Sequence, residues 1–150
     1  MKLIRTLAFA TLLAASANAF AAKTCKVDIT GNDAMQFDKK EIAIAADCTD
    51  VEVTLHHSGK LPAQAMGHNF VVSKTSDMAG IAGDGAGAGF ANDHIKPGDA
   101  RVIAHTKIVG GGQTTSVTFP TSKLKKGEAY SFFCSFPGHW SIMKGPFKFG

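Results

Sequence analysis

The amino-acid sequence predicts an all-β domain: a Greek-key sandwich or barrel of about eight short strands, with one short helical insertion around residues 75–89. Short segments in which apolar and polar residues alternate recur along the chain, and Gly, Asn, Asp or Pro separates nearly every pair of them. The chain has 150 residues, of which 45% are hydrophobic and 19% charged. This composition supplies enough apolar residues for the core of one domain and excludes a disordered chain.

The strand segments follow one another at short intervals. The first, residues 25–29, alternates with period two and is followed by the turn sequence Gly31-Asn32-Asp33, and residues 51–56 alternate most clearly. The remaining segments are residues 37–45, 68–72, 101–108, 114–119, 129–134 and 143–149. Short strands at such spacing favour an antiparallel sandwich or barrel.

One stretch, residues 75–89, lacks the strand alternation and is rich in Ala and Gly. Asp77 is the candidate N-cap of a short helix there, and its glycines make this helix weak on its own. We expect it to pack against the sandwich. The glycines between Gly83 and Gly89 do not have the spacing of a phosphate-binding loop, and no strand leads into them.

The first 21 residues have the features of a secretory signal peptide. Lys2 and Arg5 precede an apolar run at residues 7–15, and small residues follow, with candidate cleavage sites after Ala19 and Ala21. The apolar run is shorter than the ~20 residues that a membrane-spanning helix needs, and no later segment is long enough, so we expect no membrane insertion. A single domain of residues 22–150 remains.

Charge gives little support for nucleic-acid binding. Removal of Lys2 and Arg5 lowers the formal net charge from +4 to +2, and the remaining lysines are dispersed rather than gathered in a stripe. The densest basic cluster, residues 123–126, is interpreted as a solvated turn. We therefore expect no nucleic-acid partner.

The chain has three cysteines, which is an odd number for an exported protein. Cys25 and Cys48 are the best candidates for a disulfide, because both lie at the ends of apolar-alternating segments and such bonds persist in an oxidising compartment. Cys134 is then left without a partner. An unpaired exported thiol is a liability unless it is buried, reactive or bound to a metal.

The residues around Cys134 indicate a metal site. Cys134, His139 and Met143 lie within ten residues in a loop between two strand segments, with the spacing Cys-x4-His-x3-Met. His68, which follows Gly67, offers a second imidazole at the start of another strand segment. Two imidazoles, one thiolate and a weakly bound thioether are the ligand set of blue-copper electron-transfer sites, because soft sulfur ligands favour Cu(I) while imidazoles serve both oxidation states.

Other interpretations of these residues differ in function. Taken singly, Cys134 and Met143 would be interpreted as core residues. Cys134 with a histidine base is the minimal pair of a thiol hydrolase, although no Asn or Asp that orients the histidine is evident. A copper carrier or buffer would favour exposed, exchangeable Met and His ligands. The leading interpretation is an electron carrier, which is a binding protein and not an enzyme.

The sequence resembles the azurins, a family of small periplasmic blue-copper proteins with the cupredoxin fold. The resemblance covers nearly all of the chain after residue 21. It is carried by residues 25–29, 31–33, 66–69, 101–107, 117–119 and 132–139. Other cupredoxins, such as plastocyanins, have a shorter gap between the cysteine and the histidine that follows it.

The resemblance implies one copper ion of type 1. His68, Cys134 and His139 would be its strong ligands. Met143 would be a weak axial ligand, and the backbone carbonyl of Gly67 a second, more distant one.

The resemblance also implies roles for residues around the ligands. Asn69 resembles the residue that ties the His68 strand to the Cys134 loop, and the backbone N–H groups of Asn69 and Phe136 would point at the Cys134 sulfur. Cys25 and Cys48 match the family disulfide, and the insertion matches the single helix of the family.

The function implied by the resemblance is electron transfer in the periplasm, with c-type cytochromes and a copper nitrite reductase as expected partners. A monomer is expected. An apolar docking patch would surround the exposed edge of His139, formed by Leu61, Met66, Phe136, Pro137, Trp140 and Ile142. Trp140 stands where the family usually has a small residue, and its ring would either anchor a partner or fold back and shield the copper. His57 aligns with a histidine that can couple protonation to the redox state, although Ser58 follows it where the family often has proline.

Overall fold

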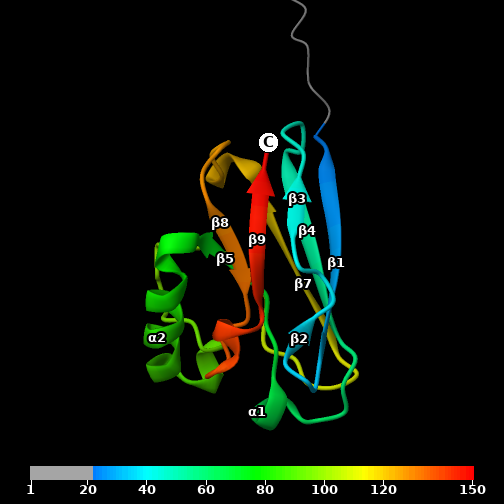
Figure 1. Cartoon of the computed structure of the whole chain (residues 1–150), viewed down its shortest axis with the longest axis vertical. Coiled ribbons are helices and arrows are strands. Elements are labelled where there is room, and N and C mark those ends of the chain that lie inside the picture. The colour runs from blue at the N-terminus through cyan, green and yellow to red at the C-terminus, as the bar shows by residue number, and fades with distance from the viewer. Residues whose placement is uncertain (1–21) are drawn as a thin grey trace, which may run out of the picture.

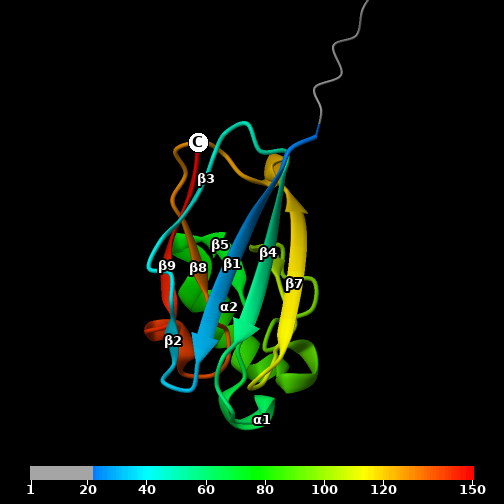
Figure 2. The ribbon, with the colours of Figure 1, turned by 90° about the vertical axis from the view of Figure 1, so that its right-hand side faces the viewer.

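The computed structural model describes residues 22–150, and the predicted signal peptide at residues 1–21 lies outside them. Two β-sheets pack face to face, and a helical segment covers the outer side of one of them (Figures 1 and 2). The first sheet has the order β2-β1-β4-β7, with β1 at Thr24–Asn32, β2 at Gln36–Phe37, β4 at Asp50–His57 and β7 at Thr114–Pro120. The second sheet has the order β3-β9-β8-β5-β6, with β3 at Ile42–Ile44, β5 at Val71–Lys74, β6 at Val102–His105, β8 at Tyr130–Phe133 and β9 at Lys144–Phe149.

The predicted all-β sandwich is confirmed, and two details of the strands differ from expectation. The described residues form nine strands, because the segment 37–45 is divided between the sheets: β2 pairs with β1, and β3 pairs with β9. The expected antiparallel arrangement is wrong for β1 with β4 and for β3 with β9, which are parallel pairs. Parallel neighbours need a crossover rather than a hairpin. The chain between β1 and β4 provides one by passing through the second sheet as β3.

The main core lies between the two sheets and follows from strand alternation. In β4, Val51, Val53 and Leu55 are fully buried, while the residues between them are partly exposed. Successive side chains of a strand point to opposite faces, so one face of β4 lies in the core. Phe132 of β8 and Phe70, just before β5, stack in the same core with ring centroids 5.9 Å apart. Each fully buried side chain of this size contributes about 1.5–3 kcal/mol.

The predicted disulfide is present, and it closes one end of the sandwich. Cys25 and Cys48 are joined, with their Cα atoms 5.8 Å apart. The bond links the start of β1 to the turn before β4. Thr121, the first residue of the short helical turn η3 (Thr121–Lys123), donates its hydroxyl to the Cys48 carbonyl over 2.7 Å. We refer to this region as the disulfide end.

The helical insertion forms as predicted. The turn η1 (Thr75–Asp77) leads into α2 (Met78–Ala88), and the further helical turns are α1 (Ala63–Met66), η2 (Phe90–Asn92) and η4 (His139–Ser141). Asp77 stands at the N-cap of α2, but its side chain makes no capping hydrogen bond, and α2 contains four glycines. Packing rather than intrinsic propensity therefore holds the helix. It covers a second apolar cluster formed by Val71, Met78, Ile81, Ala82, Ile95 and Phe133. None of the helices within residues 22–150 is long and apolar enough to cross a membrane.

Candidate metal centre

Three metal-binding side chains meet at the end of the sandwich opposite the disulfide. His68, Cys134 and His139 are all buried, and one ligand atom of each lies within 4.8 Å of the other two. The Sγ atom of Cys134 is 3.6 Å from Nδ1 of His139 and 3.9 Å from Nδ1 of His68. No other group of three or more such residues occurs in the part of the chain that the structure describes. We call these three residues the donor group.

The loop from Cys134 to Met143 brings two of the donors together through its own hydrogen bonds. Cys134 follows β8, and its N–H donates to the Met143 carbonyl over 3.0 Å. Gly138 has φ of +85°, a left-handed conformation that favours glycine, and His139 begins η4 directly after it. The N–H of His139 donates to the Phe136 carbonyl over 2.9 Å, and that of Met143 to the His139 carbonyl over 2.8 Å. These backbone hydrogen bonds close residues 134–143 into a compact loop.

His68 reaches the donor group from a distant part of the chain. It lies before β5 and forms an isolated antiparallel bridge with Val109. Its Nε2 donates to the carbonyl of Asn32 over 2.8 Å, so Nδ1 is the acceptor nitrogen that faces the thiol. Gly31 is needed beside this ring, because a Cβ there would lie 2.8 Å from the His68 Cδ2. Sequence reasoning assigned Gly31 and Asn32 only to a turn, and nothing local in the sequence marks their contact with His68.

Asn69 ties the His68 segment to the cysteine loop. Its Nδ2 donates to the Ser135 hydroxyl over 2.7 Å and to the Asp93 carbonyl over 2.9 Å. The N–H of Ser135 donates in return to Oδ1 of Asn69 over 2.8 Å. Asn69 and Ser135 are completely buried. Since a buried polar group is costly unless it is paired, this network restrains the backbone on both sides of the donors. Ser135 and Asp93 were not singled out from the sequence.

Burial controls the protonation of the donors. It raises the pKa of the Cys134 thiol to about 12, while the backbone N–H groups of Asn69 and Phe136 act in the opposite direction. Burial lowers the pKa of His139 to about 4, and neighbouring histidines add to this shift. The pKa of His68 is also lowered, chiefly by burial. At neutral pH both imidazoles are therefore unprotonated acceptors, and a positive ion between them would favour the thiolate.

The donor group fits a copper ion by its chemistry. It combines one soft sulfur with two imidazole nitrogens, which is the strong ligand set of blue-copper sites. One expected weak ligand, the Gly67 carbonyl oxygen, lies 3.9 Å from the Cys134 Sγ. The other, Met143, is fully buried, and its Cε and the His68 ring both lie within 3.5 Å of where a Cβ on Gly31 would stand.

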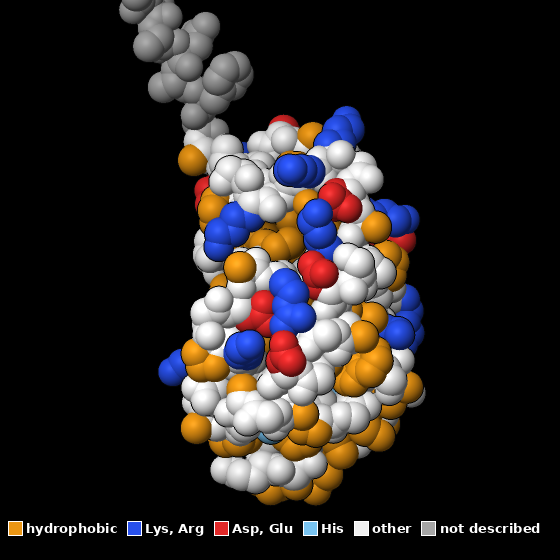
Figure 3. Space-filling model, turned by 90° about the vertical axis from the view of Figure 1, so that its left-hand side faces the viewer, with side chains coloured by type: hydrophobic (Ala, Val, Ile, Leu, Met, Phe, Trp, Pro, Cys, Tyr) orange, Lys and Arg blue, Asp and Glu red, His pale blue; other side chains and the backbone are white. Residues whose placement is uncertain are grey.

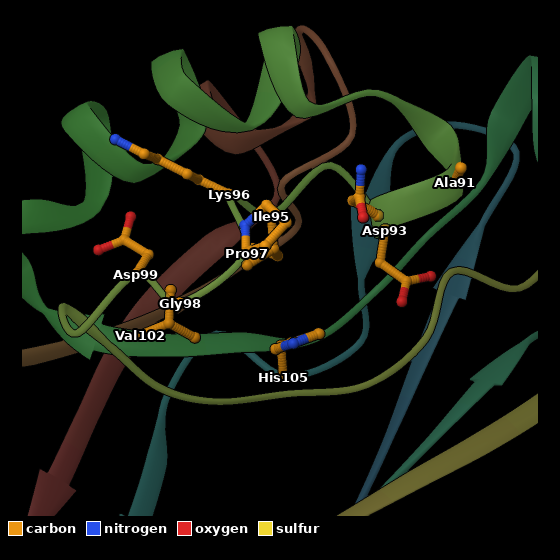
Figure 4. A pocket seen from close by; sticks show the side chains of 10 residues that line it. Ala91, Asp93, Ile95, Lys96, Pro97, Gly98, Asp99, Val102 and His105 are labelled. Carbon is orange, nitrogen blue, oxygen red and sulfur yellow. The ribbon is translucent and has the colours of Figure 1, made fainter.

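A surface hollow lies elsewhere, between β6 and the loop that follows α2. Its volume is about 390 Å³. Figure 4 shows Lys96 and Asp99 on one side of it, Asp93 on the other, and His105 between them. None of the donor group lines this hollow. A small molecule bound in that hollow would therefore not contact the thiol of Cys134.

His57 packs directly on the donor group. Its ring stacks on that of His68, with centroids 4.3 Å apart and an angle of 8° between the planes. His57 Nε2 donates to the Met66 carbonyl over 2.8 Å, and Nδ1 accepts from the N–H of Gly59 over 3.0 Å. Both ring nitrogens of His57 therefore have a backbone partner.

The residues of the expected docking patch differ in exposure. Leu61 and Ile142 are 42% and 59% exposed, and Pro137 is exposed as well. Met66 and Phe136 are partly buried. Trp140 is also partly buried and packs against the second apolar cluster beneath α2, with the ammonium of Lys144 5.8 Å from its ring centre. In Figure 3, hydrophobic side chains are visible at the lower end of the face shown, whereas the charged ones lie in its upper and middle parts.

The fold and the donor group together define a class of protein. A two-sheet sandwich with one buried cysteine and two histidines converging at one end is the arrangement of a cupredoxin, a small mononuclear copper protein. The family model described as "Copper binding proteins, plastocyanin/azurin family" matches residues 23–149, so the chain belongs to that family and its cofactor is copper.

Individual relatives agree with this assignment. The azurin of Alcaligenes faecalis is 60% identical over 126 residues, which cover 84% of this chain and 98% of the relative. The azurin of Pseudomonas chlororaphis is 60% identical over 121 residues, covering 81% and 94% of the two chains. A solved structure of the azurin Az-iso2 from Methylomonas sp. strain J is similar with a TM-score of 0.81 and 44% identity, covering 84% of this chain and 98% of that one.

Proposed function

We propose that the protein is a periplasmic one-electron carrier that holds its copper in the donor group. The observation that carries the proposal is the convergence of one thiol and two unprotonated imidazole nitrogens, all buried, in a member of a copper-binding family. His68, Cys134 and His139 would be the strong ligands, and the Met143 thioether and Gly67 carbonyl the weak ones. In such a ligand set copper cycles between Cu(I) and Cu(II).

The chain's own residues hold the ligand geometry. The Asn69 network joins the two segments that carry the ligands, and the Asn32 carbonyl orients the His68 ring. A preformed site has little to rearrange when an electron enters or leaves. The backbone N–H groups of Asn69 and Phe136 stabilise charge on the Cys134 sulfur, and this bonding together with the exclusion of water sets the reduction potential.

Electrons would enter and leave through the edge of His139. No described residue forms a hydrogen bond with its Nε2, whereas the corresponding nitrogen of His68 is held by Asn32. The exposed Leu61, Pro137 and Ile142 would form the centre of a small apolar docking surface for transient redox partners. Partners of this kind are c-type cytochromes and a copper nitrite reductase.

The periplasmic location and the monomeric state are part of the same proposal. The signal-peptide features of residues 1–21 and the Cys25–Cys48 disulfide both favour an oxidising compartment outside the cytoplasm. A monomer leaves the docking surface free for partners.

Two alternatives fit the geometry less well. A thiol hydrolase needs a nucleophile that substrate can reach, but Cys134 has no exposed surface and its pKa is raised to about 12. A copper carrier or buffer needs ligands that exchange readily, whereas this donor group is buried and fixed by hydrogen bonds. Neither substrate turnover nor copper delivery is therefore proposed.

A redox titration of the copper-loaded protein, followed by visible absorption, tests the proposal. An electron carrier with a Cu(II)–thiolate bond should be intensely coloured, lose the colour on reduction and recover it fully on oxidation. A copper-loaded protein without colour would contradict the thiolate site. Copper loss in each redox cycle would favour the carrier or buffer instead.

A further inference from the structure

A second hollow, of about 210 Å³, lies away from the donor group. Its polar lining consists of Lys74, Asp77, Arg101, Lys123, Lys125 and Tyr130. Lys74 ends β5 and pairs with Tyr130 at the start of β8. About 10 Å of strand separates Tyr130 from Phe133, which precedes Cys134, so this hollow is not part of the metal centre. Figure 3 shows the side of the molecule on which α2 lies, with Lys and Arg side chains interleaved with Asp and Glu in its upper and middle parts. We call the hollow the cationic pocket.

Several hydrogen-bond donors of the cationic pocket have no acceptor in the part of the chain that the structure describes. Tyr130 is 3% exposed, and its oxygen accepts from the Lys125 N–H over 2.7 Å, but its own O–H has no acceptor among the described residues. The Lys123 ammonium donates to the Ile103 carbonyl over 3.2 Å, and its other two N–H groups have no acceptor among residues 22–150. The Lys125 ammonium has no carboxylate within 4.0 Å in the described part of the chain.

The other two cations are held in place by carboxylates that do not line the pocket. Lys74 pairs with Glu128 at 3.1 Å. Arg101 uses Nε and Nη2 for Asp99 and Nη2 for Asp84. Its Nη1 makes no hydrogen bond to any described residue. The two pairs fix these side chains at the wall of the pocket without using all of their donors.

Asp77 is the single carboxylate in the lining. It makes no capping bond to α2, and its nearest hydrogen-bond partner is the Ser76 hydroxyl at 3.5 Å. Its negative charge opposes any anion in the pocket. Asp77→Asn should therefore strengthen the binding of an anion, and it removes no capping hydrogen bond from α2.

We propose that the cationic pocket binds a small tetrahedral oxyanion of the phosphate class. The unbonded donors of Tyr130, Lys123 and Lys125 exceed the single carboxylate in the lining, and oxyanions accept several such bonds at once. The volume suffices for the anion and some of its water, since one water occupies ~30 Å³. We expect a Kd of roughly 1 mM for the anion. Binding is weak because Lys123 and Lys125 are exposed, so salt screens their charges. No residue of the donor group takes part, so the site is independent of electron transfer.

The test is a titration of the copper(I)-loaded protein with inorganic phosphate, followed by amide NMR spectra at an ionic strength held constant with chloride. Saturable shifts should appear at the amides of Lys125, Tyr130 and Arg101, while the colour of the oxidised protein stays the same. Lys125→Ala should weaken phosphate binding about tenfold, the effect of losing one charge-assisted hydrogen bond. Tyr130→Phe should weaken it too, and Asp77→Asn should strengthen it.

Lys126→Ala is the matched control, because Lys126 carries the same charge one residue further on but does not line the pocket. It should change the affinity by less than about twofold, through long-range charge alone. Shifts that grow without saturation, or equal losses in Lys125→Ala and Lys126→Ala, would indicate a diffuse basic surface and overturn the proposal. An unchanged affinity in Asp77→Asn would also overturn it.

Discussion

The two ends of the sandwich are stabilised in different ways. At the donor end, Asn69 and Ser135 exchange buried hydrogen bonds of 2.7 and 2.8 Å, and every ligand side chain is buried. At the disulfide end, a covalent bond joins Cys25 to Cys48, and the charged side chains around η3 lie at the surface. Polar groups near the metal are fixed against each other by buried hydrogen bonds, whereas the other end is closed by a covalent bond. Mutations at the donor end should therefore change the copper site without removing the disulfide, and mutations of the disulfide should lower stability without changing the copper site.

The largest effect is expected at the donor end, in Cys134→Ser. The substitution removes the soft sulfur, so the copper-loaded protein should lose the intense visible absorption completely. The copper-free fold should persist, because the disulfide and the main core do not depend on this atom. Met143→Ala is the comparison: it should keep much of the colour and shift the reduction potential, because an axial thioether is a weak ligand. Equal loss of colour in the two variants would contradict this order of ligand strength.

The next effect is expected at the disulfide end. Replacing both Cys25 and Cys48 by Ala should lower the free energy of unfolding by about 3 kcal/mol, because the bond closes a loop in the unfolded chain; the two cysteines are 23 residues apart. Denaturant unfolding of the copper-free variant measures this loss. The visible absorption of the copper-loaded variant should remain that of the parent, since the donors lie at the other end. A changed spectrum would mean that the two ends are coupled.

A smaller effect is expected for Asn69→Ala. It leaves the Ser135 N–H and the Asp93 carbonyl buried without this partner, which should cost about 2 kcal/mol in unfolding free energy. The reduction potential should shift as well, because the loop that carries Cys134 is loosened. Ser135→Ala is the matched control: it keeps the bond from the Ser135 N–H to Asn69 and should cost about 1 kcal/mol. Equal losses of unfolding free energy in the two variants would argue against a contribution from the hydrogen bond between the Ser135 N–H and the Asn69 side chain.

The features that the sequence predicted well are local ones. The alternation of Val51, Val53 and Leu55 indicates a strand with one buried face, and the structure has it as β4. The glycine-rich insertion was recognised because it lacks this period. The loop from Cys134 to Met143 was recognised because the spacing Cys-x4-His-x3-Met brings three metal-binding side chain types within ten residues. The expectation for the segment 37–45 was less accurate, because alternation does not reveal which sheet each half of a segment joins.

The sequence by itself determined the fold class and singled out the disulfide pair and the loop that carries Cys134 and His139, because periodicity, cysteine number and ligand spacing can be read without the tertiary structure. Only the tertiary structure decided how His68 meets Cys134 across 66 residues, and why Gly31 and Asn32 stand beside its ring. It also decided that the ring of Trp140 lies on the cluster beneath α2. These contacts depend on the packing of two sheets whose strands are far apart in the chain, and no local pattern encodes that packing.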